Sequence, residues 1–311
     1  HLFDMFKDTY LDRGYEMVEG ARIKSWKAGG HGLQTFLQVL ENSSNPGFVE
    51  ISRRMGLENL YEYVMRFGFG TKTGVDMPGE SSGIMFAKHA MGPVEQATVA
   101  FGQGISVTPI QLVTAFSAII NGGILYKPYI TKSINDPITH DPIVEVKPTK
   151  QRRVISEETS KQMRYALESV VANGGGKPAY LEGYQIGGKT GTAQKAENGV
   201  YSHSNYILSF LSAAPMNDPQ IVLYVAADSP NNDILYGGTV IAPIVKACYE
   251  DILPYLGIEK VEKQIPKKLV WPETENIVLQ NFIGKRKEEV HQEGVTFTFV
   301  GDGDVVMEQL P

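Results

Sequence analysis

Cysteine is almost absent from this 311-residue chain, which contains only Cys248. A single thiol excludes an internal disulfide framework and a zinc site built from several cysteines. Long apolar runs are also missing, because no stretch approaches the ~18 residues that a membrane-spanning helix needs. Basic residues are not in excess, since 29 Lys and Arg face 35 Asp and Glu, for a formal net charge of −6. This balance argues against a protein that binds duplex DNA or anionic membranes through its overall field.

The rest of the composition is that of an ordinary globular protein. Hydrophobic residues make up 42% of the chain and charged residues 21%, which excludes disorder, collagen and coiled coils. At roughly 150 residues per domain, the length allows about two domains. The sequence opens at His1 with no initiator methionine and no signal peptide, so we expect it to belong to a longer protein.

Hydrophobic periodicity predicts helices around an antiparallel sheet. Apolar residues recur at helical spacing, bounded by caps and turn residues, at 33–42, 46–56, 57–67, 109–121, 156–173 and 240–256. Three strand-like runs lie between the last two helices, at residues 184–193, 206–214 and 220–226. Residues 1–30 are expected to be irregular or hairpin structure, and residues 71–106 mostly loop. Helices before and after an antiparallel sheet define an α+β fold.

A change of composition predicts how the chain divides. Residues 257–275 are charged and contain proline, which favours a linker between a large domain at 1–256 and a small module at 276–311. In the module we expect a helical stretch near residues 285–292 and a strand at 295–300. Because residues 276–311 are too few to build a sturdy core, we expect the module to be incomplete.

The sharpest chemical signal is Lys189-Thr190-Gly191-Thr192, which follows two glycines on the first predicted strand. On a strand edge it would place an ammonium and two hydroxyls along one groove, and the preceding glycines would let a ligand backbone approach. Such an edge can pair with an extended peptide and hold its terminal carboxylate. The alternative for Lys189 is a solvated lysine in a glycine-rich turn. A second Lys-Thr-Gly at residues 72–74 lies in a predicted loop, where we expect no catalytic role.

Ser43-Ser44-Asn45 lies at the break between two predicted helices, where side chains can project into a cleft. The S-x-N pattern is weak alone, because it also occurs at residues 133–135 and 229–231. Asn45 could also simply cap the helix that begins at Pro46. The combination is stronger, because S-x-N at a helix break and K-T-G-T on a later strand form a signature of penicillin-interacting serine acyltransferases.

These motifs and their surroundings resemble the transpeptidase domain of class B penicillin-binding proteins, in particular those of the stage V sporulation protein D type. The resemblance covers residues 1–256 in order, and residues 276–311 resemble the first part of a PASTA module. It implies the fold that penicillin-binding proteins share with serine β-lactamases. Besides the two motifs, it rests on the segments at residues 26–32, 67–70, 78–80, 101–109, 121–123 and 236–238.

The resemblance implies a D,D-transpeptidase that cross-links peptidoglycan stem peptides through a serine acyl-enzyme and binds β-lactams, in cell-wall or spore-cortex synthesis. Ser43 would relay a proton toward the leaving nitrogen, Asn45 would bind the substrate's amide, and Lys189 would raise the local positive potential.

The terminal carboxylate of the substrate would be bound by Thr190 and Thr192, which flank Gly191. The backbone N–H of Thr192 would form half of an oxyanion hole. No cofactor and no metal ion are expected.

The family's nucleophile lies in an S-x-x-K motif, and no serine of this sequence is followed by lysine at the third position. In the family the motif lies upstream of S-x-N, so the nucleophile and its lysine base are expected to precede residue 1. Residues 1–311 alone are therefore predicted to be inactive. Relatives of the sporulation type often carry cysteine at the positions of Ser25 and Ser44. Two thiols there could form a redox-sensitive disulfide or, with His31 and a nearby carboxylate, a metal site. With serine at both positions, neither is expected here.

Two other functions remain open from the sequence. The domain could sense penicillin or muropeptides, or it could be a β-lactamase or D,D-carboxypeptidase of the same fold. The class B scaffold and the lack of a kinase or helical signalling segment favour the transpeptidase. The family further implies a membrane glycosyltransferase of the shape, elongation, division and sporulation type as partner, no nucleic-acid partner, and a place on the outer face of the cell membrane, held by an N-terminal helix.

Overall fold

The computed structural model describes residues 2–197, 200–231, 236–268, 280–292, 295 and 297–309, except for the side chains of residues 196, 197, 200, 203 and 204. The chain forms two compact units, His1–Lys268 and Leu269–Pro311. The K-T-G-T and S-x-N motifs both lie in the first unit.

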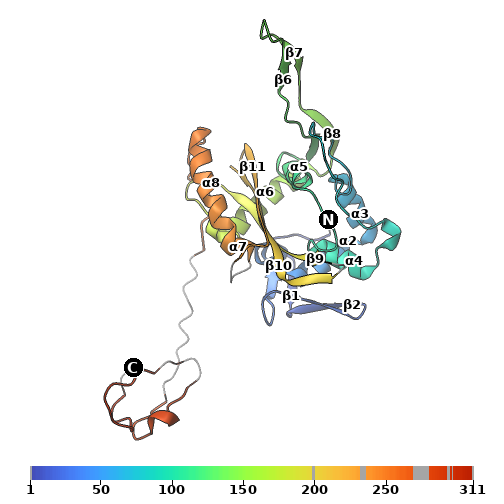
Figure 1. Ribbon diagram of the computed structural model, residues 1–311. Coiled ribbons are helices and arrows are strands. Elements are labelled where there is room, and N and C mark those ends of the chain that lie inside the picture. The colour runs from blue at the N-terminus through green and yellow to red at the C-terminus, as the bar shows by residue number, and fades with distance from the viewer. Residues whose placement is uncertain are drawn as a thin grey trace. The chain divides into compact units, whose positions relative to one another are not determined.

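A three-stranded antiparallel sheet carries the K-T-G-T motif (Figure 1). Its strands are β9 (Gly187–Glu197), β10 (Val200–Ala214) and β11 (Ile221–Asp228), in the order β11-β10-β9. Thr190 lies opposite Phe210 and Thr192 opposite Leu208. Among the described residues, this order leaves β9 as an edge strand with one side unpaired.

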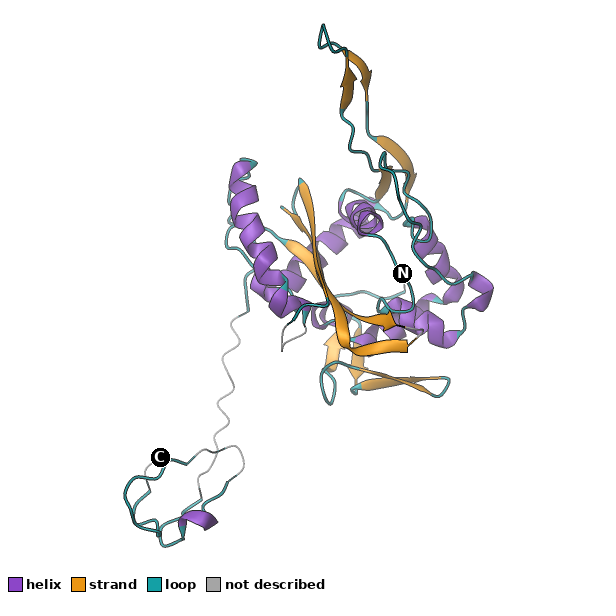
Figure 2. Ribbon diagram, in the orientation of Figure 1, coloured by secondary structure: helices purple, strands orange, loops and turns teal. Residues whose placement is uncertain are grey.

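Alternation along β10 divides the core between the two faces of the sheet. Leu208 and Phe210 are fully buried against Tyr249 of α8 (Ala242–Tyr255), which follows the short helix α7 (Gly237–Val240). Ala213, one position out of phase, packs on the other face with α5 (Pro109–Ile120) and α6 (Glu157–Asn173). Figure 2 shows helices on both sides of these strands. The predicted α+β fold with helices around an antiparallel sheet is thus confirmed.

Helices α5 and α6 begin where the sequence predicts them, because side chains cap their first turns. Thr108 Oγ1 accepts a hydrogen bond from the Gln111 N–H at 3.2 Å, and Ser156 Oγ accepts one from the Thr159 N–H at 3.0 Å. Each bond satisfies a backbone donor that the helix cannot pair internally.

A group of shorter helices carries the S-x-N motif: α1 (Phe36–Asn42), α2 (Asn45–Met55) and α3 (Leu57–Arg66). A fourth helix, α4 (Pro93–Ala100), was missed, since residues 71–106 were expected to be mostly loop. Its Gly92-Pro93 start suggests a turn, but proline is well suited to the first position of a helix. The Glu95 side chain accepts the Gly92 N–H at 2.9 Å and closes that first turn.

Two ribbons precede these helices. Strand β1 (Thr9–Asp12) pairs with β4 (Gly32–Thr35), and β2 (Tyr15–Val18) pairs with β3 (Ala21–Lys24). The hairpin expectation for residues 1–30 is confirmed, but the first helix begins later than predicted. Leu33 lies on β4 and is 70% exposed, because Thr35 caps α1 and fixes its start at residue 36.

Two further ribbons lie between α5 and α6. Strand β5 (Ile124–Lys127) pairs with β8 (Thr149–Arg153), and β6 (Ser133–Asn135) pairs with β7 (Pro142–Glu145). The β6–β7 ribbon projects away from the rest of the unit (Figure 1). Single 3₁₀ turns occur at η1 (Lys88–Ala90) and η2 (Lys177–Ala179).

Residues 257–268, the first part of the predicted linker, lie against the large unit. The Ile265 N–H donates to Glu168 Oε1 at 2.8 Å, and Gln264 Nε2 donates to the Leu181 carbonyl at 3.0 Å. These bonds satisfy buried polar groups of the domain, so this stretch is part of its structure. Residues 269–275 of the predicted linker lie outside the described residues.

The small unit has little regular structure in its described residues. The helix predicted near residues 285–292 is only the 3₁₀ turn η3 (Lys287–Glu289), and the described residues of 295–300 form no strand. Both predictions were wrong. For the helix the reason is that the charged run at residues 285–289 offers no apolar face to bury. Phe282 and Phe297 meet edge-on, with ring centroids 5.2 Å apart. Across the whole described part of the chain, no helix is long and apolar enough to cross a lipid bilayer.

Candidate active site

Two motifs that are far apart in sequence meet through a direct hydrogen bond. Lys189 Nζ of β9 donates to Ser43 Oγ at 2.7 Å, and also to the Thr190 carbonyl at 3.1 Å. The structure therefore brings together the S-x-N serine and the K-T-G lysine, as the motif pair in the sequence predicts. The two other S-x-N copies lie elsewhere: residues 133–135 form β6, and Ser229 bonds to Lys195.

Ser43 holds a strained backbone conformation at the end of α1. Its φ and ψ angles are 53° and 46°, in the left-handed region that L-residues other than glycine rarely adopt. The Ser44 N–H donates to the Val39 carbonyl at 3.1 Å, and the Ser43 N–H to the Leu40 carbonyl at 3.3 Å. This is the Schellman pattern, in which glycine is usual at the position of Ser43. A serine there, with its hydroxyl on a lysine, indicates that the side chain is kept for function.

The ammonium of Lys189 is partly buried, and no carboxylate of the described residues forms an ion pair with it. Burial disfavours its charged form and lowers the pKa from 10.5 to about 8. A lysine with this pKa is mostly protonated at neutral pH but can lose its proton readily. Such a group is suited to proton transfer near neutrality.

The other residues of S-x-N have separate roles. Ser44, fully buried, caps α2: its Oγ accepts the Gly47 N–H at 3.2 Å. Asn45 is therefore the first residue of α2 and not its cap, which removes the structural alternative considered for it. Asn45 Nδ2 donates to the Lys24 carbonyl at 3.3 Å.

The two threonines of K-T-G-T lie on the face of β9 opposite to Lys189. Thr192 Oγ1 accepts the Gly237 N–H at 3.1 Å. A methyl group built at Gly238 would lie 3.8 Å from Thr190 Cγ2. Both side chains thus face the Gly237-Gly238 turn at the start of α7. Strand alternation separates them from the lysine, so the ammonium and the two hydroxyls do not lie side by side on one strand face.

The glycines of this strand serve the packing of β9. A Cβ at Gly188 would come 2.6 Å from the Leu211 carbonyl oxygen, and a Cβ at Gly187 would come 2.2 Å from Met216. A Cβ at Gly191 would come 2.5 Å from Ser209 Oγ. The expectation that the two glycines before Lys189 admit a ligand was therefore wrong: they admit Met216 and the neighbouring strand β10.

The second Lys-Thr-Gly lies in a loop, as predicted. Thr73 Oγ1 donates to Glu80 Oε1 at 2.5 Å, and the Gly74 N–H donates to Glu80 Oε2 at 3.0 Å. These bonds hold the Pro78-Gly79-Glu80 turn closed and lower the pKa of Glu80. This copy shapes a turn and has no contact with S-x-N.

Sequence reasoning missed Asp12, the last residue of β1. Its side chain is 1% exposed, and its Oδ2 accepts hydrogen bonds from Ser44 Oγ at 2.8 Å and Ser25 Oγ at 3.3 Å. The two serines discussed as cysteine positions therefore meet on one carboxylate oxygen. No sequence motif marks Asp12, because the contact is created by folding. Within the described residues, no group of His, Cys, Asp and Glu could hold a metal ion.

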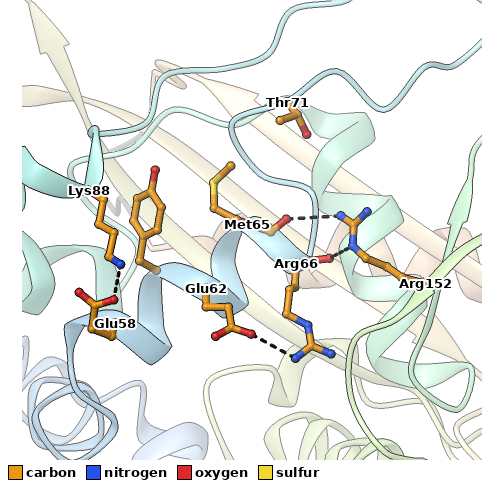
Figure 3. A pocket seen from close by; sticks show the side chains of 8 residues that line it. Glu58, Glu62, Met65, Arg66, Thr71, Lys88 and Arg152 are labelled. Carbon is orange, nitrogen blue, oxygen red and sulfur yellow. Dashed lines mark hydrogen bonds and ion pairs between the residues drawn. The ribbon is translucent and has the colours of Figure 1, made fainter.

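A pocket on α3 lies apart from these motifs (Figure 3). Its charged groups already have partners: Lys88 pairs with Glu58, and Arg66 pairs with Glu62 at 3.5 Å. Arg152 Nε donates to the Arg66 carbonyl at 2.8 Å. Because it holds no motif residue and its charges are satisfied, we assign it no function.

The fold agrees with comparisons to known proteins. Residues 5–250 match the family model of the penicillin-binding protein transpeptidase domain. The chain belongs to this family.

The relatives make the class more specific. The chain is 51% identical over 307 residues to stage V sporulation protein D of Bacillus subtilis, covering 98% of this chain and 48% of that protein. It is 31% identical over 251 residues to the peptidoglycan D,D-transpeptidase FtsI of Escherichia coli, covering 80% of this chain and 39% of that one. The chain thus spans half or less of the length of these relatives.

Solved structures show the same architecture. The transpeptidase domain of Burkholderia pseudomallei penicillin-binding protein 3 aligns with a TM-score of 0.72 at 33% identity, covering 81% of this chain and 73% of that one. Penicillin-binding protein 3 of Mycobacterium tuberculosis, in complex with ampicillin, aligns with a TM-score of 0.75 at 28% identity, covering 84% and 59%. The predicted penicillin-binding protein fold is confirmed.

Proposed function

We propose that this chain is the part of a peptidoglycan D,D-transpeptidase that carries the S-x-N and K-T-G-T motifs, and that the complete protein acts in cell-wall or spore-cortex synthesis. The single observation that carries the proposal is the hydrogen bond from Lys189 Nζ to Ser43 Oγ. It joins the two motifs in a domain whose relatives are named as D,D-transpeptidases and as a sporulation protein.

The reaction would begin with attack of a serine hydroxyl on the D-Ala–D-Ala amide, giving an acyl-enzyme and releasing D-Ala. The leaving nitrogen needs a proton. Ser43 accepts a hydrogen bond from the Lys189 ammonium, so its own O–H is free to donate toward that nitrogen. Lys189, with a pKa of about 8, could resupply the proton.

The substrate would lie along the open edge of β9. An extended stem peptide can add to an unpaired strand edge through main-chain hydrogen bonds. Asn45 Nδ2 already donates to the Lys24 carbonyl, which leaves the Oδ1 acceptor for a substrate N–H. We further propose that Thr190 and Thr192, beside Gly191, receive the terminal carboxylate, and that the Thr192 N–H contributes to the oxyanion hole.

The acylated serine and its base would come from an S-x-x-K motif in the complete protein, because residues 1–311 contain none. We also retain the proposals that the domain works on the outer face of the cell membrane, anchored by an N-terminal helix, beside a membrane glycosyltransferase. The division into a domain at 1–256, a linker at 257–275 and a partial PASTA-like module at 276–311 stays a prediction. The bonds of residues 264 and 265 to the domain favour a shorter linker.

Incubation of the complete protein with a pentapeptide-bearing glycan strand tests the function. We expect release of D-Ala together with cross-linked dimers, and a penicilloyl-enzyme that lasts minutes to hours. Penicillin binding without D-Ala release would indicate a sensing module. Penicilloyl turnover within milliseconds would indicate a β-lactamase, and D-Ala release without dimers a carboxypeptidase.

Thr192→Val probes the carboxylate site. The variant keeps the shape of the side chain but removes the hydroxyl, and a hydrogen bond to a charged group contributes about 1.5–3 kcal/mol. We expect acylation of the complete protein by penicillin to slow by ~10-fold or more, chiefly through weaker binding. The matched control is Thr73→Val in the second K-T-G, which should leave the acylation rate unchanged. Equal rates for Thr192→Val and the wild type would remove Thr192 from the substrate site.

A further inference from the structure

We propose that Asp12 is a positioning residue of the active site: its buried carboxylate fixes the Ser43–Asn45 turn through Ser44 and keeps Ser43 within reach of Lys189. This inference rests on the proposed transpeptidase function and names a residue outside the S-x-N and K-T-G-T motifs. Its starting point is that Ser44, the middle residue of S-x-N, points away from Lys189 and into the body of the domain, where it meets Asp12.

The residues around Asp12 enclose its carboxylate and fix its position through hydrogen bonds. Its side chain is almost wholly enclosed, and no ion pair reaches it among the described residues. Hydrogen bonds satisfy it instead: Oδ1 accepts the Gly14 N–H at 2.8 Å, and Oδ2 accepts from Ser44 and Ser25. The backbone at Gly30 closes over it, because a Cβ there would lie 2.6 Å from Asp12 Oδ1. A buried carboxylate that is held by hydrogen bonds and forms no salt bridge is costly, so its donors cannot move without leaving it exposed or unpaired.

The segment that contains Ser25 also forms two hydrogen bonds with the S-x-N turn and the residue before it. The Lys24 carbonyl accepts from Asn45 Nδ2 at 3.3 Å, and Trp26 Nε1 donates to the Asn42 carbonyl at 2.7 Å. Three successive residues therefore contact the turn or the carboxylate that holds it. Lys24 bonds to Asn45, Ser25 bonds to Asp12, and Trp26 bonds to Asn42.

These contacts set the geometry of the reacting groups. Ser43 occupies the left-handed conformation between Asn42, held by Trp26, and Ser44, held by Asp12. With both neighbours fixed, Ser43 Oγ projects toward β9 and meets Lys189 Nζ at 2.7 Å. Displacement of a reacting group by about 1 Å can slow a reaction by ~100-fold. Asp12 therefore acts on catalysis through Ser44 without touching the substrate.

Rates of acylation by a fluorescent penicillin, measured on the complete protein, test this role in Asp12→Asn, Ser44→Ala and Ser25→Ala. We expect Asp12→Asn and Ser44→Ala to slow acylation by ~10- to 100-fold, and Ser25→Ala, whose bond is longer, to slow it less. The double variant Asp12→Asn/Ser44→Ala should be no slower than the slower single variant, because both break one interaction. The control is Glu168→Gln, which alters another buried carboxylate that accepts a backbone N–H away from the site.

A second readout separates positioning from general destabilisation. The pKa of the Lys189 amine can be followed by NMR in residues 1–311, where no acylation is needed. Loss of the Ser43 contact removes a hydrogen bond to the charged form, so Asp12→Asn and Ser44→Ala should lower that pKa, and Glu168→Gln should not. If the wild type is acylated but Asp12→Asn and Ser44→Ala match the control in rate and in the Lys189 pKa, the inference is wrong. If the wild type itself is not acylated, the proposed function fails instead.

Discussion

Lys189→Met should make the domain more stable and the complete protein nearly inactive. Methionine has a similar shape but no charge, so the variant removes a cation whose burial lowers its pKa from 10.5 to about 8. That shift corresponds to roughly 3 kcal/mol of destabilisation at neutral pH. We expect the free energy of unfolding to rise by about 2–3 kcal/mol, because the lost bond to Ser43 offsets part of the gain. Acylation by penicillin should slow by ~100- to 1000-fold.

The control for this variant lies on the same strand. Lys195 pairs with Asp228 at 2.7 Å, near the surface, where ion pairs contribute about 0–1 kcal/mol. Lys195→Met should therefore leave both stability and acylation close to wild type. Urea unfolding and stopped-flow acylation measure the two quantities. A Lys189→Met protein that is less stable than the wild type would show that burial of the charged ammonium does not destabilise the folded domain.

The stabilisation by Lys189→Met should also depend on pH with a definite sign. Below pH 8 the lysine is protonated in both the folded and the unfolded chain, so its full cost is present. Between about pH 8 and 10.5 the folded chain loses this proton while the unfolded chain keeps it, so the wild type gains stability as the pH rises. The difference in unfolding free energy between variant and wild type should thus be largest at pH 7 and much smaller at pH 9.5.

Ser43→Gly and Ser43→Ala should both slow acylation by ~100-fold, yet differ in stability. Each removes the hydroxyl that accepts from Lys189. Glycine adopts the left-handed conformation of this position freely, whereas alanine does so at a cost of about 1 kcal/mol. We therefore expect Ser43→Gly to unfold at higher urea concentration than Ser43→Ala.

A matched pair at Ser52 should show the opposite order. Ser52 lies inside α2 with its hydroxyl bonded to the Val49 carbonyl. In a helix interior glycine is less favourable than alanine by about 1 kcal/mol, so Ser52→Gly should be less stable than Ser52→Ala. The same order at both positions would mean that Ser43 carries no backbone strain, and the argument that its side chain is kept for function would lose its basis.

The sequence was sufficient for the main sheet and for the motif pair. Strand runs at 184–193, 206–214 and 220–226 became β9, β10 and β11. Helix ends were predictable where a cap or a turn residue fixes them, as at Thr108 and Ser156. These features are local, because a backbone donor and its capping side chain are only three residues apart.

Features that depend on tertiary contacts were not predictable. The expected ligand role of Gly187 and Gly188 failed because Met216 and β10, not a ligand, occupy the space beside them. The role of Asp12 could not be inferred, since its partners Ser25 and Ser44 are brought to it only by folding. Strand alternation turns Thr190 and Thr192 away from the Lys189 side, and this separation follows from the sequence spacing alone.

Labelling with a fluorescent penicillin, followed by mapping of the adduct by mass spectrometry, tests the central claim most directly. The complete protein and residues 1–311 would be labelled in parallel. We predict an adduct in the complete protein on the serine of an S-x-x-K motif, slowed by Lys189→Met, and no adduct in residues 1–311 alone. A penicilloyl adduct on a serine within residues 1–311 would contradict the account, because Ser43 and Lys189 would then act beside a nucleophile that the sequence analysis did not find.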